Sequence, residues 1–351
     1  MSKLPKSPTG LAPYTQLPGG LVISAPVAER MEDLAFQSKS ANTWRAYRQG
    51  WADFVEFCKT NGAKALPADA LTVAAYITER SAGHSIATIE LRLTAISQAH
   101  KAKKLQSPTS SVEVKTILKG LKRTKGTQQV QKAPVLTSVV MDMVKMIDSE
   151  GPVGKITGPL GLGALRDRAL LLLGFSLACR RSELVGIDVE HLKMLPDPLR
   201  MVVLIAKSKT DQVGHGRKVV ISSSPDPVFC PVRAVNAWLK ASGIITGPVF
   251  RGVLQADRGI RPGRLTAAVV AEVVKEYALK LGLDPETFAG HSLRSGHITS
   301  ALDRNVGLPD IMATTGHKST TMVLRYRRFN EQAVTSSGQL GLGEKKNPEV
   351  K

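Results

Sequence analysis

Apolar residues recur at helical spacing through the first third of the chain. Between residues 40 and 61, spacings of three and four mark the stripe of an amphipathic helix, formed by Trp44, Tyr47, Trp51, Phe54, Val55 and Cys58. Ser40 is placed to cap the start of this helix, and Asn61-Gly62 to end it. Similar patterns over residues 71–77, 86–96 and 112–121 predict three more helices. We therefore expect residues 39–122 to form a compact all-α domain.

The pattern becomes mixed after residue 134. Helical spacing predicts helices near residues 139–147, 164–178, 232–239, 265–281, 292–302, 309–314 and 320–328. Two short β-branched runs, at residues 201–206 and 218–222, flank a polar turn and predict a β-hairpin. Residues 135–330 are thus expected to form an α+β domain with a small antiparallel sheet, and the fold class of the whole chain is predicted to be mainly α.

Three segments lack a sustained period. Residues 1–38 are rich in Pro, Gly and Ser, which predicts a mostly disordered arm. Residues 123–134 contain a single large apolar residue, Val130, and end in Pro134, which is typical of a basic interdomain linker. Residues 331–351 are expected to form a short C-terminal tail.

The chain of 351 residues carries 48 Lys and Arg against 29 Asp and Glu, a formal net charge of +19. Residues 1–132 hold 19 basic and 9 acidic side chains, a share of +10, so the remainder contributes +9. Both halves being basic favours a nucleic-acid partner held from two sides, although a solvated basic surface would have the same composition.

Composition excludes several classes of protein. Three scattered cysteines, Cys58, Cys179 and Cys230, are too few for a disulfide framework or a paired zinc motif, which indicates a reducing, cytoplasmic location. No apolar run approaches the roughly 18 residues of a membrane span, and the first twenty residues lack an apolar signal core.

Four stretches carry candidate chemistry: A-C-R-R-S-E-L at residues 178–184, K-S-K-T at 207–210, H-S-L-R at 291–294, and G-H-K-S at 316–319 with L-R-Y-R-R at 324–328. Each alone also fits a structural role. Together they hold what phosphoryl transfer without a metal requires: guanidiniums to bind phosphate oxygens, a tyrosine nucleophile, a lysine acid and histidines that move protons. We see no residue cluster suited to a metal or nucleotide cofactor, and therefore expect none.

The order of these residues resembles that of tyrosine recombinases of the phage integrase family, in a layout similar to Cre-like and Xer-like members. The likeness spans roughly residues 40–330, and the helical N-terminal domain is similar to the family's core-binding domain. A-C-R-R-S-E-L resembles the family's first box, G-L-R-x-x-E-L, and His291 with Arg294 matches H-x-x-R. Tyr326 follows His317 of a G-H motif by nine positions.

The resemblance implies roles for these residues. Arg180 would be the first catalytic arginine with Glu183 as its supporting acid, and that acid favours Arg180 over the adjacent Arg181. Lys209 would protonate the leaving 5′-hydroxyl, with Lys207 as the alternative lysine.

Four further residues complete the implied site. Tyr326 would attack the scissile phosphate to form a 3′-phosphotyrosine, and Arg294 would hold that phosphate together with the first arginine. His291 would act as acid and base, and His317 would donate to a phosphate oxygen.

The implied function is site-specific recombination through a four-way junction, on duplex DNA carrying an inverted-repeat site. A dimer on one site and a tetramer in synapsis are expected, with a prokaryotic, phage or plasmid origin. The expected DNA-binding residues of the first domain are Lys101, Lys103, Lys104, Lys122, Arg123 and Lys125. Two alternatives remain: a type IB topoisomerase that reseals the same strand, and a DNA-binding protein that does not cleave.

Overall fold

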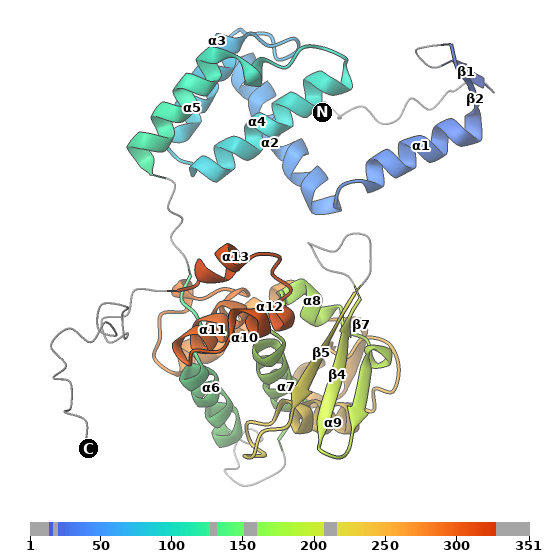
Figure 1. The fold of residues 1–351 in the computed structure, drawn as a ribbon, viewed down its shortest axis with the longest axis vertical. Helices are drawn as coiled ribbons and strands as arrows, with labels where there is room; N and C mark the ends of the chain where they lie inside the picture. Colours follow the sequence, from blue (N-terminus) through green and yellow to red (C-terminus); the bar gives the residue numbers. More distant parts are fainter. Residues whose placement is uncertain (1–13, 17–19, 127–131, 151–159, 207–215, 328–351) are drawn as a thin grey trace, which may run out of the picture. The chain divides into compact units, whose positions relative to one another are not determined.

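The computed structural model describes residues 14–16, 20–126, 132–150, 160–206 and 216–327. The chain separates into two compact units, residues 1–130 and 131–351 (Figure 1). Within the described residues, no helix has the length and apolar character needed to cross a lipid bilayer.

The first unit contains a bundle of four helices, α2 (Ala41–Thr60), α3 (Ala70–Ser81), α4 (Ile86–Ala102) and α5 (Val112–Lys125). Each begins at a residue whose side-chain oxygen accepts a hydrogen bond from the first turn, namely Ser40, Asp69, Ser85 and Ser111. The core is built around Phe54, Tyr76, Ile77, Ile89 and Ile96, each fully buried. The all-α domain predicted from the periodicity is confirmed.

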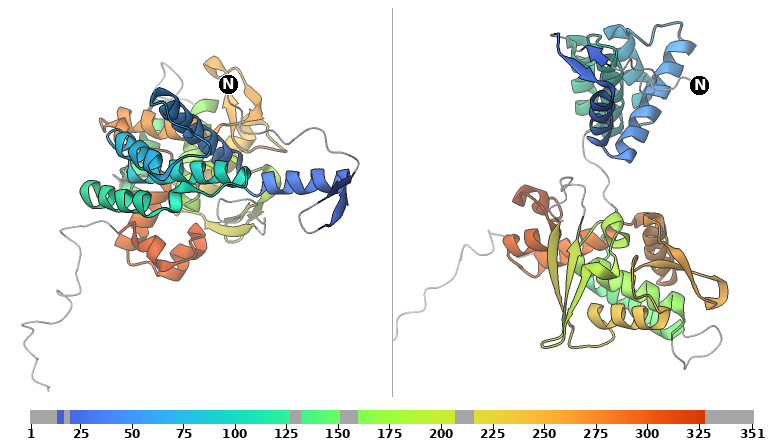
Figure 2. Two further views of the ribbon diagram at one scale, coloured as in Figure 1. Left: turned by 90° about the horizontal axis from the view of Figure 1, so that it is seen from above. Right: turned by 90° about the vertical axis from the view of Figure 1, so that its right-hand side faces the viewer.

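The expected disordered arm is wrong for the part of it that the structure describes, residues 14–16 and 20–38. Strands β1 (Tyr14–Gln16) and β2 (Val22–Ser24) form a small hairpin, and α1 (Ala25–Gln37) follows it. Pro26 lies in the first turn of α1, where its fixed φ favours a helix start. The indole of Trp44 stacks on Phe36 at 5.5 Å between ring centroids and donates to the Phe36 carbonyl, which ties the end of α1 to α2. Elsewhere α1 extends away from the bundle (Figures 1 and 2).

The boundary of the first domain also lies later than expected. Helix α5 continues through Arg123 to Lys125, whose ammonium group donates to the Ser81 carbonyl and so anchors the last turn to α3. Gly126, at φ 70°, ends the helix. Of the predicted linker, residues 127–131 lie outside the described part of the chain.

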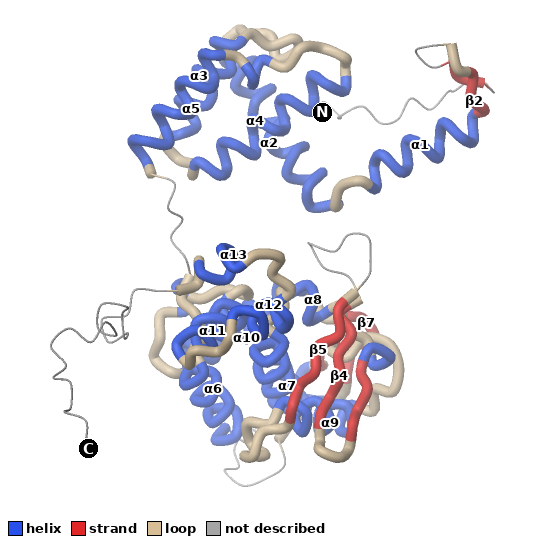
Figure 3. The backbone as a smooth tube through the Cα atoms, in the orientation of Figure 1, coloured by secondary structure: helices blue, strands red, loops and turns tan. Residues whose placement is uncertain are grey.

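In the second unit, helices surround the apolar helix α7 (Leu162–Leu177), in which Leu170, Leu171, Leu173 and Leu177 are fully buried. Strands β3 (Leu192–Leu195), β4 (Arg200–Ile205) and β5 (Arg217–Ser222) form an antiparallel sheet beside it, and α9 (Pro231–Ser242) contacts both α7 and β5 (Figure 3). The unit also contains the helices and strands α6 (Thr137–Glu150), α8 (Arg181–Val185), β6 (Arg251–Val253), β7 (Ile260–Arg264), α10 (Ala267–Lys280), α11 (Ser292–Asp303), α12 (Leu308–Thr315) and α13 (Thr320–Leu324). The predicted α+β domain with a small antiparallel sheet is confirmed.

The chain enters this unit along α11. The backbone N–H of Val135 donates to the Ser292 carbonyl at 2.9 Å, so the two segments lie in direct contact. Gly296 permits this approach, since a Cβ at this position would lie 1.7 Å from the Val135 carbonyl oxygen. The segment at Val135 is therefore packed tightly against α11, the helix that carries Arg294 of H-x-x-R.

Candidate active site

Arg180 stands at the turn between α7 and α8. Ala178 ends α7 in the left-handed region, at φ 45°, and this reversal places Arg180 at the cap of α8. The Glu183 carboxylate accepts from the Arg180 backbone N–H at 3.0 Å and from its guanidinium at 2.5 Å. Glu183 is buried, whereas Arg181 is exposed to solvent. Of the two adjacent arginines, Arg180 is thus the one that the buried acid orients.

Arg294 projects from the first turn of α11 into the interior, where it is 1% exposed. Its guanidinium donates to the Ala178 carbonyl at 2.6 Å and to Nε2 of His317 at 3.0 Å. Burial, followed by the charge of Arg180, lowers the pKa of this guanidinium from its ordinary value. Arg294 therefore connects the end of α7 to the segment after α12.

His317 has a defined tautomer. The Thr315 hydroxyl donates to the Ile311 carbonyl at 2.7 Å, so its oxygen is the acceptor for Nδ1–H of His317 at 2.8 Å. Nε2 then carries the lone pair that accepts from Arg294. Burial, with the nearby Arg294 charge, lowers the pKa of His317 to about 4. In this state the imidazole accepts a hydrogen bond, so the expected donation to a phosphate oxygen requires a different arrangement once DNA is bound.

Tyr326 lies in a turn directly after α13, whereas the periodicity placed it within a helix over 320–328. Its phenolic oxygen is 3.0 Å from Nε2 of His291, and its ring centroid is 5.8 Å from that of His317. The Thr299 hydroxyl donates to the Tyr326 carbonyl at 3.3 Å, which ties this turn to α11. Partial burial, followed by the charges of Arg294 and Arg180, lowers the pKa of His291.

The structure brings together six of the residues singled out in the sequence: Arg180, Glu183, His291, Arg294, His317 and Tyr326. They come from the α7–α8 turn and α8, from the start of α11 with its cap residue, and from the turns on either side of α13. Lys209 and its alternative Lys207 lie outside the described residues.

Comparison with known proteins identifies the family to which the chain belongs. The model of the phage integrase family matches residues 158–333. The integrase/recombinase xerD homolog of Selenomonas ruminantium is 38% identical over 293 residues, covering 83% of this chain and 82% of the relative. The chain belongs to the phage integrase family of tyrosine recombinases.

Similarity also extends over most of the chain in a more distant relative and in two solved structures. Tyrosine recombinase XerA of Pyrococcus horikoshii is 25% identical over 292 residues, or 83% of this chain and 85% of the relative. A lambda integrase dimer bound to a COC′ core site superposes with a TM-score of 0.57 at 14% identity, covering 88% of this chain and 79% of that one. XerH recombinase bound to a palindromic difH substrate gives 0.54 at 18% identity, covering 75% and 70%.

One residue of this integrase fold was not found from the sequence. Arg217, the first residue of β5, donates to the Thr314 carbonyl and lies 3.7 Å from the Glu183 carboxylate. Val219 and Ile221 of the same strand are buried, so the alternation of β5 places Arg217 on the inward face with them. The alternation of buried and exposed positions along β5 is the sequence signal that could have identified Arg217.

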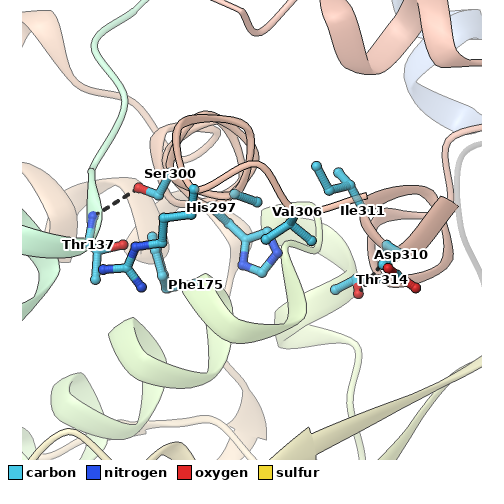
Figure 4. Close-up of a pocket in the computed structure, with 10 residues that line it drawn as sticks. Thr137, Phe175, His297, Ser300, Val306, Asp310, Ile311 and Thr314 are labelled. Atoms are coloured by element: carbon cyan, nitrogen blue, oxygen red, sulfur yellow. Dashed lines mark hydrogen bonds between the residues drawn. The ribbon is translucent and has the colours of Figure 1, made fainter. Parts of the chain in front are cut away.

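A pocket of about 290 Å³ lies beside the family's H-x-x-R helix, between α7, α11 and α12 (Figure 4). His297 lines it with its ring packed edge-on against Phe175, 5.5 Å away, and burial lowers the pKa of this histidine to about 4. None of the six clustered residues lines this pocket. Across the described chain, no three His, Cys, Asp or Glu side chains are grouped to hold a metal ion.

The basic residues expected to bind DNA lie on α4, α5 and the adjoining turn of the first unit. Lys101, Lys103, Lys104 and Arg123 are exposed to solvent. Lys122 instead pairs with Glu90 at 2.6 Å, and Lys125 bonds the Ser81 carbonyl. Lys125 is exposed as well, although its ammonium group is occupied by that carbonyl, and the role of all six residues in DNA binding stays a prediction.

Proposed function

We propose that this protein is a site-specific DNA recombinase that cleaves and rejoins duplex DNA through a 3′-phosphotyrosine intermediate. The observation that carries the proposal is the contact between the Tyr326 hydroxyl and His291 Nε2, made beside two arginines of the same chain. Membership of a tyrosine recombinase family supports the same chemistry.

The cleavage step is a transesterification. The Tyr326 oxygen attacks phosphorus as its proton passes to Nε2 of His291, and the bond from phosphorus to the 5′-oxygen breaks. The departing oxygen takes a proton from Lys209, which keeps the role predicted for it. The phosphotyrosine retains the ester, so a 5′-hydroxyl of a second DNA strand can reverse the step without a nucleotide cofactor.

Arg180 and Arg294 bind the non-bridging oxygens of the scissile phosphate in this mechanism. Guanidiniums fixed in advance stabilise the charge that develops on those oxygens in the transition state. Both arginines are held by protein acceptors, Arg180 by Glu183 and Arg294 by the Ala178 carbonyl and His317. His317 accordingly positions Arg294 in this mechanism.

We assign duplex DNA with an inverted-repeat site as the substrate, bound by a dimer and exchanged within a tetramer through a four-way junction. The even division of positive charge between the two halves of the chain supports phosphate contacts from both. Curated bacterial relatives support a prokaryotic origin and a cytoplasmic location.

A nicked suicide substrate tests the chemistry. The full-length protein selects a binding site from a random-sequence duplex pool, and a nick is then moved along that site so that cleavage releases a short fragment and traps the adduct. Wild type is expected to form a covalent protein–DNA species at one nick position, and Tyr326→Phe to form none while still binding. Tyr47→Phe, on α2, is the matched control and should react as wild type does.

Other outcomes decide for the alternatives. An adduct in Tyr326→Phe would remove Tyr326 as nucleophile, and no adduct in wild type would favour a protein that only binds DNA. Supercoil relaxation with no exchange between two sites would favour the topoisomerase.

A further inference from the structure

Glu183 faces two cations. One carboxylate oxygen lies 2.5 Å from the Arg180 guanidinium, and the other lies 3.7 Å from Nη2 of Arg217. The Glu183 side chain is only 3% exposed, and both arginine side chains are 20% exposed. The three charges thus form a group that is largely shielded from water.

Arg217 is held in place from a second direction. Its Nη1 donates to the Thr314 carbonyl in the last turn of α12, two residues before Gly316. Gly316 adopts φ 71°, and a Cβ there would lie 3.0 Å from Nε of Arg217, so the guanidinium packs against the turn that leads to His317. Nη2 is buried and makes no hydrogen bond, so Glu183 is the charge that it faces.

A close pair with Glu183 has a consequence for Arg180. A carboxylate 2.5 Å away orients the guanidinium, but it also cancels much of the charge that a phosphate would meet. A second guanidinium on the other carboxylate oxygen offsets that cancellation. With neutral histidines, Arg180, Arg217 and Arg294 against Glu183 give this described cluster a formal charge of +2. A phosphodiester attacked by a phenolate carries a charge of about −2 in its transition state, which this cluster matches.

We propose that Arg217 is a positioning residue for DNA cleavage, which shares the Glu183 carboxylate and so leaves the charge of Arg180 available to the scissile phosphate. This rests on the proposed recombinase function. Arg217 reaches no phosphate itself; it acts through Glu183 and Arg180.

The test compares single-turnover adduct formation on the nicked substrate. Arg217→Met keeps an unbranched side chain and removes the charge, and we expect the rate to fall about 10- to 100-fold, as for other residues that support a reacting group. Arg217→Lys should retain most of the rate. The deciding variant joins Arg217→Met to Glu183→Gln, because removing both charges returns the cluster to +2. This double variant should cleave faster than Arg217→Met alone.

Arg251→Ala is the matched control, because this arginine also donates to backbone carbonyls, those of Pro248 and Thr246, but contacts no residue of the cluster. It should cleave as wild type does. A double variant as slow as, or slower than, Arg217→Met would overturn the proposal. Arg217 would then have only a structural role, in holding the end of α12 through the Thr314 carbonyl. Arg217→Met cleaving at the wild-type rate would overturn the proposal as well. If wild type formed no adduct, the proposed recombinase function itself would be wrong. That result is distinct from the two outcomes that overturn the role of Arg217.

Discussion

The phenolic oxygen of Tyr326 and Nε2 of His291 lie 3.0 Å apart within one chain. The lowered pKa of His291 keeps its imidazole neutral near pH 7. In the Nδ1–H tautomer of that neutral ring, Nε2 is the acceptor for the hydrogen of the phenol. In the proposed mechanism the nucleophile and its base therefore come from the same protomer, and each copy would cleave the strand to which its own arginines bind.

This pairing predicts a pH dependence of cleavage. A base must be unprotonated to act, and a pKa below the ordinary 6.5 means that the His291 imidazole stays neutral into more acidic solution. We expect the fall of the single-turnover rate in acid to be centred below pH 6.5, the ordinary pKa of histidine. The rate of adduct formation on the nicked duplex, measured from pH 8 to pH 5, gives the profile.

The His291→Ala variant should lose about 10²- to 10⁴-fold in rate and also lose the acid limb of that profile. His84→Ala, in the helical unit, serves as the control and should keep both. An acid limb that persists unchanged in His291→Ala would assign the titration to another group.

His297 makes a separate prediction about stability. Its pKa of about 4 in the folded protein lies below the unfolded value of 6.5, so the unfolded chain binds the proton more tightly. The contribution of the neutral His297 side chain to the free energy of unfolding is fully present above pH 6.5. It is lost as pH falls from 6.5 toward 4. At pH 5 the loss amounts to about 1–2 kcal/mol.

His297→Phe keeps an aromatic ring against Phe175 and removes the titrating group. Its melting temperature should fall less between pH 7.5 and pH 5 than that of wild type, although His317 leaves part of the acid sensitivity in place. His84→Phe should melt with the wild-type pH dependence, and an equal fall in His297→Phe would contradict the assignment.

The exposed lysines that follow α4 predict the salt dependence of DNA binding. Each phosphate contact that is lost should reduce the slope of log K against log salt by about 1. We expect this reduction for Lys103→Ala and for Lys104→Ala, and a smaller one for Lys122→Ala, because Lys122 already pairs with Glu90.

Lys145→Ala on α6 is the control: it removes a lysine paired with Asp142 and should leave the slope unchanged. Equilibrium titrations between 50 mM and 200 mM salt measure the slopes, and equal slopes for all four variants would exclude this surface.

The periodicity of the sequence was enough to predict the two helical regions and the hairpin, because buried stripes such as the one containing Trp51 and Phe54 repeat every turn. Helix α1 was not predicted. Val27, Met31 and Leu34 have helical spacing, but they are exposed and follow a stretch rich in Pro and Gly. Motif order identified the six clustered residues. It could not identify Arg217, whose bonded partner Thr314 is 97 positions away, nor the tautomer of His317, which depends on the hydroxyl of Thr315.

Gly296 predicts that a normally favourable substitution will destabilise this fold. Alanine within a helix usually stabilises it by about 0.5–1 kcal/mol relative to glycine. At Gly296 the added methyl group would lie 1.7 Å from the Val135 oxygen and 2.4 Å from its carbonyl carbon, so the entering segment must move off α11. We expect Gly296→Ala to lower the free energy of unfolding by about 1–3 kcal/mol, as overpacking does.

The same substitution on α5 supplies the comparison. Gly120 is exposed and helical, and nothing lies within 4 Å of its Cβ position, so Gly120→Ala should stabilise the helical unit. Urea denaturation of both variants measures the two effects, with opposite signs expected. Because α11 also carries Arg294, Gly296→Ala should slow adduct formation, whereas Gly120→Ala should leave its rate unchanged. A stable Gly296→Ala protein that cleaves at the wild-type rate would show that the segment at Val135 does not have to pack against α11 for the site to form.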